Sequence, residues 1–293
     1  MIVITGANGQ LALALRRLCI ERSIAHTALA RDALDITDGK AVASMLAGLG
    51  EIDCIINCAA YTQVDLAESH PQEAYAVNAL APWNLARTGI PVIHVSTDYV
   101  FDGTADAPYE TDAPARPISV YGLSKRAGET ALLEGGFEGL IVRTAWVYSA
   151  APEAKNFLNT MKRLFASRTE VCVVNDQKGA PTLADDLADI LLSLYEKGLH
   201  RRPMEVVHAT NAGEATWFEF AREIARLTKA SAHVRPIATE QYPTPAHRPT
   251  YSVLSLKKLR SWGICPRDWK AALADALRSS GCSDYSDCEA QCK

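Results

Sequence analysis

The chain opens with a short apolar run that leads straight into a glycine-rich turn. Residues 1–5 read Met-Ile-Val-Ile-Thr, a pattern that predicts a buried strand. The run 6–12, Gly-Ala-Asn-Gly-Gln-Leu-Ala, follows at once and leads into a helical pattern. Gly6 permits a tight turn, Gly9 lets the backbone approach phosphates, and Ala12 lets the helix pack close to the strand. Because a helix start offers unpaired N–H groups to an anion, this order predicts a dinucleotide-binding α/β fold; the alternative is an ordinary strand-to-helix turn.

Strand and helix patterns then alternate through the first half of the chain. Expected strands cover residues 52–57, 91–96 and 140–143, and expected helices cover 69–86 and 122–133. Alternation of this kind predicts a doubly wound parallel sheet, Rossmann-like, with helices on both faces. Ligands of such sheets bind beyond the carboxyl ends of the strands.

The pattern changes near residue 150, where proline-bearing loops begin to interrupt short helices. A chain of 293 residues is long enough for two modest domains. We expect a dinucleotide-binding domain over 1–150 and a smaller C-terminal region, mainly substrate-binding, over 151–293. Part of 171–210 is expected to pack back on the first domain.

Tyr121 and Lys125 form a Tyr-x-x-x-Lys pair. Tyr121 immediately precedes the expected helix 122–133, and Lys125 lies in its first turn. Positions i and i+4 lie on the same helix face, so the ammonium is expected to favour the phenolate and lower the tyrosine pKa from about 10. A tyrosine tuned in this way exchanges a proton with a carbonyl oxygen near neutral pH. The pair alone is not specific, since most such pairs are solvated helix-face residues.

Five ordered blocks give the pair its context. They read S-T-D-Y-V-F-D-G at 96–103, Y-G-L-S-K-R-A-G-E at 121–129, R-T-A-W-V-Y at 143–148, N-D-Q-K-G-A-P-T at 175–182 and Y-P-T-P-A-H-R-P at 242–249. With the glycine loop, this set resembles the dTDP-4-dehydrorhamnose reductase family of the extended short-chain dehydrogenase/reductase superfamily. The resemblance runs from residue 6 to about residue 249.

The resemblance implies roles for the matching residues. Tyr121 would protonate the C4 ketone oxygen of dTDP-4-dehydro-L-rhamnose, a dTDP-4-keto-6-deoxy sugar, while NADPH delivers hydride. Lys125 would hold the nicotinamide ribose, and the Thr97 hydroxyl would bind the carbonyl or Tyr121. Asp98 and Trp146 would contact the sugar. From the residues alone, the alternative for Asp98 is a turn residue that caps Tyr99. The alternative for Trp146 is plain core packing.

The resemblance also implies a cofactor site at the ends of the first three strands. Its residues are Gly6, Gly9, Gln10, Leu11, Arg31, Asp35, Ile36, Ala60, Tyr61 and Thr62, together with Tyr121 and Lys125. The second strand ends at Arg31 without an acid for a ribose 2′-hydroxyl, and an arginine suits a 2′-phosphate. This favours NADPH, with NADH possible and a solvated loop arginine as the alternative.

Besides the missing acid at the end of the second strand, two further features depart from the family pattern. Some members carry a magnesium site at a dimer interface that includes a glutamate of the first helix, and Ala14 stands at the matching position. We therefore expect no metal, although Asp185 and Asp186 remain acidic. The other departure is a tail with Cys282, Cys288 and Cys292, whose spacing fits no zinc template.

Composition excludes several classes of function. The net charge of −4 and the absence of a basic stripe argue against nucleic acid as a partner. The sequence contains no run of eighteen apolar residues, so no membrane span is expected. No signal peptide is recognisable, and we therefore expect a cytoplasmic location with reduced cysteines. A monomer and a homodimer both remain open.

Two other functions remain open at this stage. One is a related nucleotide-4-keto-sugar reductase or epimerase, which would share the same three catalytic residues. The other is a non-catalytic NADP-binding subunit similar to the regulatory subunit of methionine adenosyltransferase. Retention of Thr97, Tyr121 and Lys125 together favours catalysis.

Overall fold

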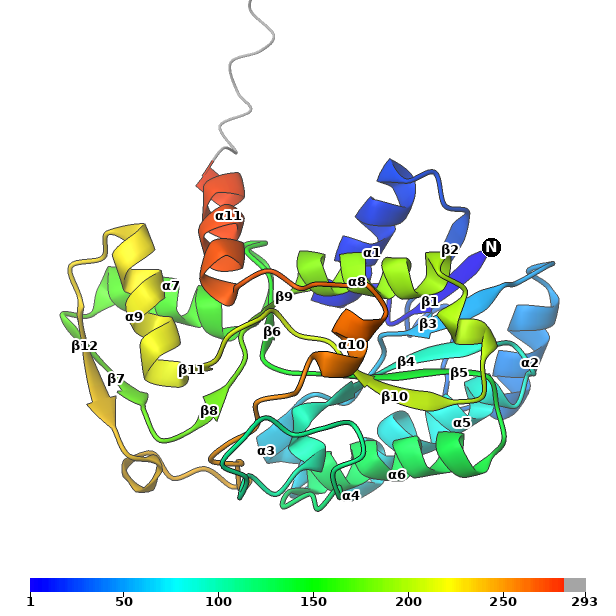
Figure 1. Cartoon of the computed structure of the whole chain (residues 1–293), viewed down its shortest axis with the longest axis horizontal. Helices are drawn as coiled ribbons and strands as arrows, with labels where there is room; N and C mark the ends of the chain where they lie inside the picture. The colour runs from blue at the N-terminus through cyan, green and yellow to red at the C-terminus, as the bar shows by residue number, and fades with distance from the viewer. Residues whose placement is uncertain (282–293) are drawn as a thin grey trace, which may run out of the picture.

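The computed structural model describes residues 1–281 as a parallel sheet with helices on both faces and a second lobe beside it (Figure 1). The sheet consists of β1 (Ile2–Thr5), β2 (His26–Leu29), β3 (Cys54–Asn57), β4 (Val92–Thr97), β5 (Gly139–Thr144) and β10 (Glu205–His208). Their spatial order is β2-β1-β3-β4-β5-β10, and all neighbours are parallel. The predicted doubly wound Rossmann-like fold is confirmed.

Successive residues of the strands bury their side chains on opposite faces of the sheet, as the pleat requires. Ile2 and Ile4 of β1 pack with α1 (Gln10–Glu21) and α8 (Ala184–Glu196), whereas Val3 packs with helices of the other face. That other face carries α2 (Gly39–Ala47), α5 (Ala81–Ala86) and α6 (Val120–Glu134). In Figure 1, α1 and α8 lie above the sheet, and α5 and α6 below it.

The chain passes from β1 to β2 on one side and then crosses to β3 on the other side of β1. This reversal is the switch point where ligands of open α/β sheets bind. The connection after β3 holds α3 (Val64–Ala67) and α4 (Pro71–Tyr75). The helix expected over 69–86 begins at Pro71, widens into a π-helical turn at Ala76–Leu80 and ends as α5.

The second lobe has its own core. Its helices are α7 (Phe157–Ser167), α9 (Trp217–Thr228) and α11 (Trp269–Gly281), and its strand pairs are β6 (Val147–Tyr148) with β9 (Thr182–Leu183), β7 (Glu170–Val174) with β12 (His233–Ile237) and β8 (Lys178–Gly179) with β11 (Ala215–Thr216). The buried side chains of these helices form one apolar cluster around Phe220.

Two elements of the segment 171–210 return to the sheet. Helix α8 packs on α1, and β10 pairs with β5 at the edge. A short helix, α10 (Lys257–Ser261), follows beside β10. The division into domains at residue 150 stays a prediction. Within residues 1–281, no helix has both the length and the apolar character needed to cross a membrane.

Candidate active site

Tyr121 and Lys125 lie in the first two turns of α6, at the carboxyl end of β4. Ser119 caps this helix by accepting a hydrogen bond from the Gly122 backbone N–H at 3.2 Å. A Cβ at Gly122 would lie 2.2 Å from the carbonyl oxygen of Tyr99, so glycine allows α6 to approach the strand end closely. Both predicted catalytic side chains are buried, with 9% of Tyr121 and 1% of Lys125 exposed.

Thr97 ends β4 near the tyrosine. Its hydroxyl accepts from the Tyr99 backbone N–H at 3.2 Å and donates to Asp98 at 3.1 Å. Burial raises the pKa of Asp98 to about 6, and the hydrogen bond from Thr97 opposes the rise. The structure therefore brings Thr97, Asp98 and Tyr121 together.

The titration of the pair differs from the expectation. Burial raises the pKa of Tyr121 to about 12, the Thr97 hydroxyl lowers it, and the Asp98 charge raises it further. The Lys125 ammonium does not reverse this, because its Nζ donates to the carbonyl of Val95 at 2.7 Å and lies 3.2 Å from Nε2 of His94. The expected fall of the tyrosine pKa is wrong for the protein by itself.

Helix α6 is anchored behind these residues by a buried ion pair. Glu129 accepts from Arg143 of β5 at 2.9 Å and 2.7 Å, and from Ser96 of β4 at 2.6 Å. Burial opposes the charge, but the hydrogen bonds from Arg143 and Ser96 hold the pKa of Glu129 below its ordinary value. The pair thus connects the helix that carries Tyr121 to the two strands beside it.

The glycine loop lies at the switch point between β1 and β3. Gly6 has a φ of +72°, and a Cβ there would lie 2.8 Å from backbone atoms of Ala59, so no side chain fits. Gly9 is the N-cap of α1 and offers no side-chain cap, which leaves the first N–H groups of the helix available to an anion. Leu11 and Ala12 are buried against the sheet.

Gln10 connects this loop to the second lobe. Its amide donates to the carbonyl of Val147 at 2.9 Å and accepts from Asn156 at 3.1 Å. Since Val147 follows Trp146 directly, the glycine loop and the predicted sugar-binding segment are held side by side.

The residues predicted around the adenosine lie after β2. Arg31 and Asp35 are exposed, whereas Ile36 is buried in the core beneath α2 and α5. Asp35 accepts from the Thr37 hydroxyl at 2.7 Å and backbone N–H at 3.0 Å, and these hydrogen bonds hold its pKa below the ordinary value. Arg31 adds a weaker electrostatic contribution to the same effect.

Ala60, Tyr61 and Thr62 follow β3, and an asparagine that sequence reasoning missed positions them. Asn78 accepts from the Tyr61 N–H at 2.8 Å and donates to its carbonyl at 3.1 Å. Its amide also donates to Ser124 of α6 at 3.0 Å. A buried asparagine in the otherwise apolar run 76–80 was the available sequence signal.

Trp146 lies at the junction with the second lobe and is half-buried. Its indole stacks on Trp217 of α9 with ring centroids 3.5 Å apart and an angle of 7° between the planes. A Cβ at Gly179 would lie 2.5 Å from the indole, so the ring occupies the space above that glycine. Trp217 is a second residue that sequence reasoning missed.

Arg248 of the late proline-rich loop closes the far side of the tyrosine. It pairs with Asp65 of α3 at 3.0 Å and 2.7 Å, and while burial raises the pKa of the Tyr99 phenol, the Arg248 charge lowers it. The Tyr99 ring in turn lies edge-to-face on Tyr121 at 5.6 Å. The resemblance had pointed to this block, but no role had been predicted for Arg248.

Within residues 1–281, no group of three or more His, Cys, Asp or Glu side chains is arranged to hold a metal ion. Ala14 is buried, Asp185 pairs with Arg17, and Asp186 pairs with Arg267. The cysteines at 282, 288 and 292 lie outside the described residues.

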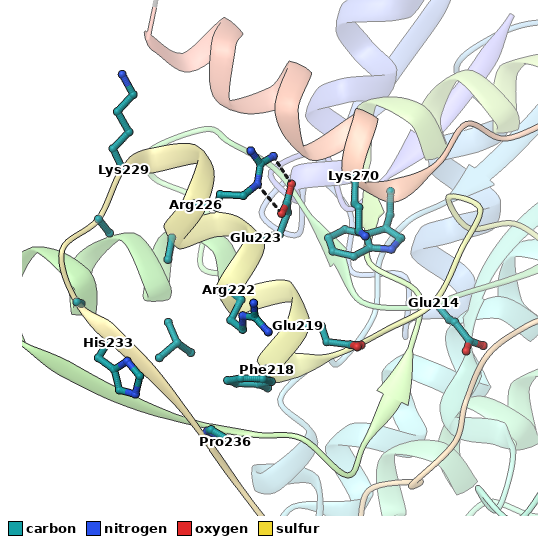
Figure 2. Close-up of a pocket in the computed structure, with 15 residues that line it drawn as sticks. Glu214, Phe218, Glu219, Arg222, Glu223, Arg226, Lys229, His233, Pro236 and Lys270 are labelled. Atoms are coloured by element: carbon teal, nitrogen blue, oxygen red, sulfur yellow. Dashed lines mark hydrogen bonds and ion pairs between the residues drawn. The ribbon is translucent and has the colours of Figure 1, made fainter.

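A separate groove of about 870 Å³ lies on the second lobe, where α9, β12 and α11 meet (Figure 2). It contains no predicted site residue. Figure 2 shows charges of both signs along it, with Glu223 and Arg226 paired at 2.6 Å. The groove therefore mixes apolar side chains with charges of both signs.

Comparisons with known proteins agree with the geometry. The family model described as RmlD substrate binding domain matches residues 1–282. A dTDP-4-dehydrorhamnose reductase from Streptomyces griseus is 45% identical, with 94% of this chain and 92% of the relative covered. A probable dTDP-4,6-dihydroxy-2-methyloxan-3-one 4-ketoreductase from Streptomyces antibioticus is 41% identical, with 94% of each covered. The crystal structure of dTDP-4-dehydrorhamnose reductase from Bacillus anthracis, in complex with NADP, has a TM-score of 0.89 and 35% identity over 95% of this chain and 98% of that one.

Proposed function

The chain belongs to the dTDP-4-dehydrorhamnose reductase family, and we propose that it reduces the C4 ketone of dTDP-4-dehydro-L-rhamnose to dTDP-L-rhamnose with NADPH. The observation that carries this proposal is the placement of buried Tyr121 and Lys125 one helical turn apart on α6, at the carboxyl end of β4, where Thr97 ends the strand. The proposal includes a cytoplasmic location, with which the five free cysteines among the described residues agree, and a monomer or homodimer.

The residues of the switch point fit a dinucleotide. The loop at Gly6 has no room for a Cβ, and the uncapped start of α1 at Gly9 offers N–H groups to a pyrophosphate. Lys125 would hold the nicotinamide ribose, and exposed Arg31 would meet the 2′-phosphate that distinguishes NADPH from NADH. Bound NADPH supplies the hydride that reduces the ketone carbon.

The protein's own residues supply the proton. With a pKa of about 12, Tyr121 is a phenol at neutral pH and has a proton to donate to the C4 oxygen. The Thr97 hydroxyl orients both the phenol and the carbonyl, and the Lys125 ammonium stabilises the tyrosinate that remains. Trp146 would present its indole face to the apolar side of the deoxysugar.

The test is NADPH oxidation measured with a panel of nucleotide 4-keto sugars. The panel includes dTDP-4-dehydro-L-rhamnose and the 2-methyloxan-3-one substrate class named for the Streptomyces antibioticus relative. The proposal predicts the highest kcat/KM for dTDP-4-dehydro-L-rhamnose. A higher value for another sugar would reassign the substrate, and NADPH binding without turnover of any sugar would favour a non-catalytic NADP-binding subunit.

A further inference from the structure

A chain of buried polar side chains runs beneath the active site from β1 to α6. The Thr5 hydroxyl donates to Oδ1 of Asn57 at 2.7 Å, and Nδ2 of Asn57 lies 3.0 Å from Nδ1 of His94. Nε2 of His94 then lies 3.2 Å from Nζ of Lys125. The residues of this chain are at most 1% exposed, and the proposed function gives Asn57 and His94 no role.

The direction of the hydrogen bonds along this chain is determined by the backbone. Oδ1 of Asn57 also accepts from the Ala59 backbone N–H at 3.1 Å, and a backbone N–H can only donate. The amide nitrogen of Asn57 therefore faces His94 and donates to its Nδ1. Burial and the Lys125 charge lower the pKa of His94 well below 6.5, so the ring is neutral and carries its single proton on Nε2.

This direction leaves the Nε2–H of His94 pointing at the Lys125 nitrogen. An amine has a lone pair that accepts this hydrogen bond, whereas an ammonium has three donors and no acceptor. The bond from Nζ to the Val95 carbonyl, at 2.7 Å, forms in either state. Every contact is thus satisfied when Lys125 is neutral, and two donors face each other when it is charged.

Other groups around Lys125 act in the opposite sense or are neutral. Glu129, one turn further along α6, favours the charged form, but its carboxylate is already shared with Arg143 at 2.7 Å. Burial raises the pKa of the Cys58 thiol to about 12, so it carries no charge at neutral pH. Tyr121 is likewise uncharged there, and burial lowers the pKa of Lys125 to about 8.

We propose that Asn57 and His94 are positioning residues that direct an N–H at Lys125 and so disfavour its charged form in the free protein. This inference rests on the proposed function, in which Lys125 holds the nicotinamide ribose and stabilises the tyrosinate. At alkaline pH, where Lys125 of the free protein is neutral, binding of NADPH is then accompanied by proton uptake at Lys125, since the ribose hydroxyls favour the ammonium.

The first experiment uses the wild-type protein. Long-range ¹H–¹⁵N NMR of the His94 ring distinguishes the two neutral tautomers, and it is recorded above the Lys125 pKa of about 8, where this lysine is mostly neutral. The proposal predicts the proton on Nε2 and the lone pair on Nδ1. A proton on Nδ1 would overturn it, because Nε2 would then accept from a charged Lys125.

The second experiment measures NADPH affinity as a function of pH. In the wild type, affinity falls as pH rises past the pKa of Lys125 in the free protein, about 8. His94→Gln offers an amide oxygen to the ammonium, so the midpoint should move up by about one pH unit, a roughly tenfold change in the protonation equilibrium. Asn57→Asp should act in the same direction, because a carboxylate accepts from Nδ1–H and leaves Nε2 free to accept.

His200→Gln is the matched control, since His200 is equally buried and contacts Tyr195 and Arg201 rather than Lys125. Its midpoint should equal that of the wild type. An unchanged midpoint in His94→Gln contradicts the proposal, and a shift in Asn57→Asp alone would attribute the effect to added charge. Absence of sugar reduction with a shifted midpoint would instead count against the proposed function only.

Discussion

The buried ion pair behind the active site makes a quantitative prediction for Glu129→Gln. Glutamine keeps the volume of the side chain, so no cavity forms, but the Arg143 guanidinium loses its charged partner while it stays buried. Removing one member of a buried pair costs about 3–5 kcal/mol. The contribution of Arg126 is smaller because that side chain is 34% exposed and screened by solvent. We therefore expect the free energy of unfolding to fall by about 3–5 kcal/mol.

The assay is urea unfolding followed by circular dichroism, with Glu134→Gln as control. Glu134 is exposed at the end of the same helix, and its substitution should change stability by less than about 0.5 kcal/mol. The pKa of Glu129 is lower in the folded protein, so its stabilising contribution is complete above the unfolded value of about 4.3 and is lost as pH falls through the folded value. The difference in the free energy of unfolding between wild type and Glu129→Gln should therefore become smaller in that acid range. A cost below about 1 kcal/mol at neutral pH would refute the reasoning.

Three further substitutions test the individual assignments. Arg31→Ala should weaken NADPH more than NADH, by less than about 1 kcal/mol because the side chain is exposed, and equal effects in a binding titration would make Arg31 a bystander. Trp146→Ala should raise KM for the nucleotide sugar, leave NADPH affinity intact and cost about 0.5–1.5 kcal/mol for the lost stacking on Trp217. A stability loss of about 3–5 kcal/mol with a normal KM would make Trp146 a core residue. Lys125→Met should weaken NADPH binding and slow turnover together, and unchanged values of both would remove Lys125 from the site.

The alternation of strands and helices in the first half of the chain was predictable because its signals are local. The β-branched run before Gly6 and the small residue at position 12 belong to a strand and a helix that are joined by one short turn and are consecutive in the sequence. Tyr121 and Lys125 are also four residues apart, so their common face follows from helix geometry.

The features that escaped prediction depend on partners far apart in the chain. Asn78 positions Tyr61 from 17 residues away, and Trp217 stacks on Trp146 only because the fold brings the start of α9 beside the residue that precedes β6. The pKa of Tyr121 is raised rather than lowered because desolvation on burial dominates. The motif shows only the spacing of Tyr121 and Lys125, and burial cannot be read from it. Lys125 shares the predicted face, but its Nζ binds β4, which no helical pattern could indicate.

The central claim is that Tyr121 donates the proton to the C4 oxygen. The direct measurement is kcat for Tyr121→Phe with NADPH and dTDP-4-dehydro-L-rhamnose, together with the Kd for NADPH. Phenylalanine keeps the ring that packs on Tyr99, so NADPH should bind with nearly wild-type affinity. The account predicts a fall in kcat of about 10²–10⁴, the range for a lost general acid. A kcat close to that of the wild type would contradict it.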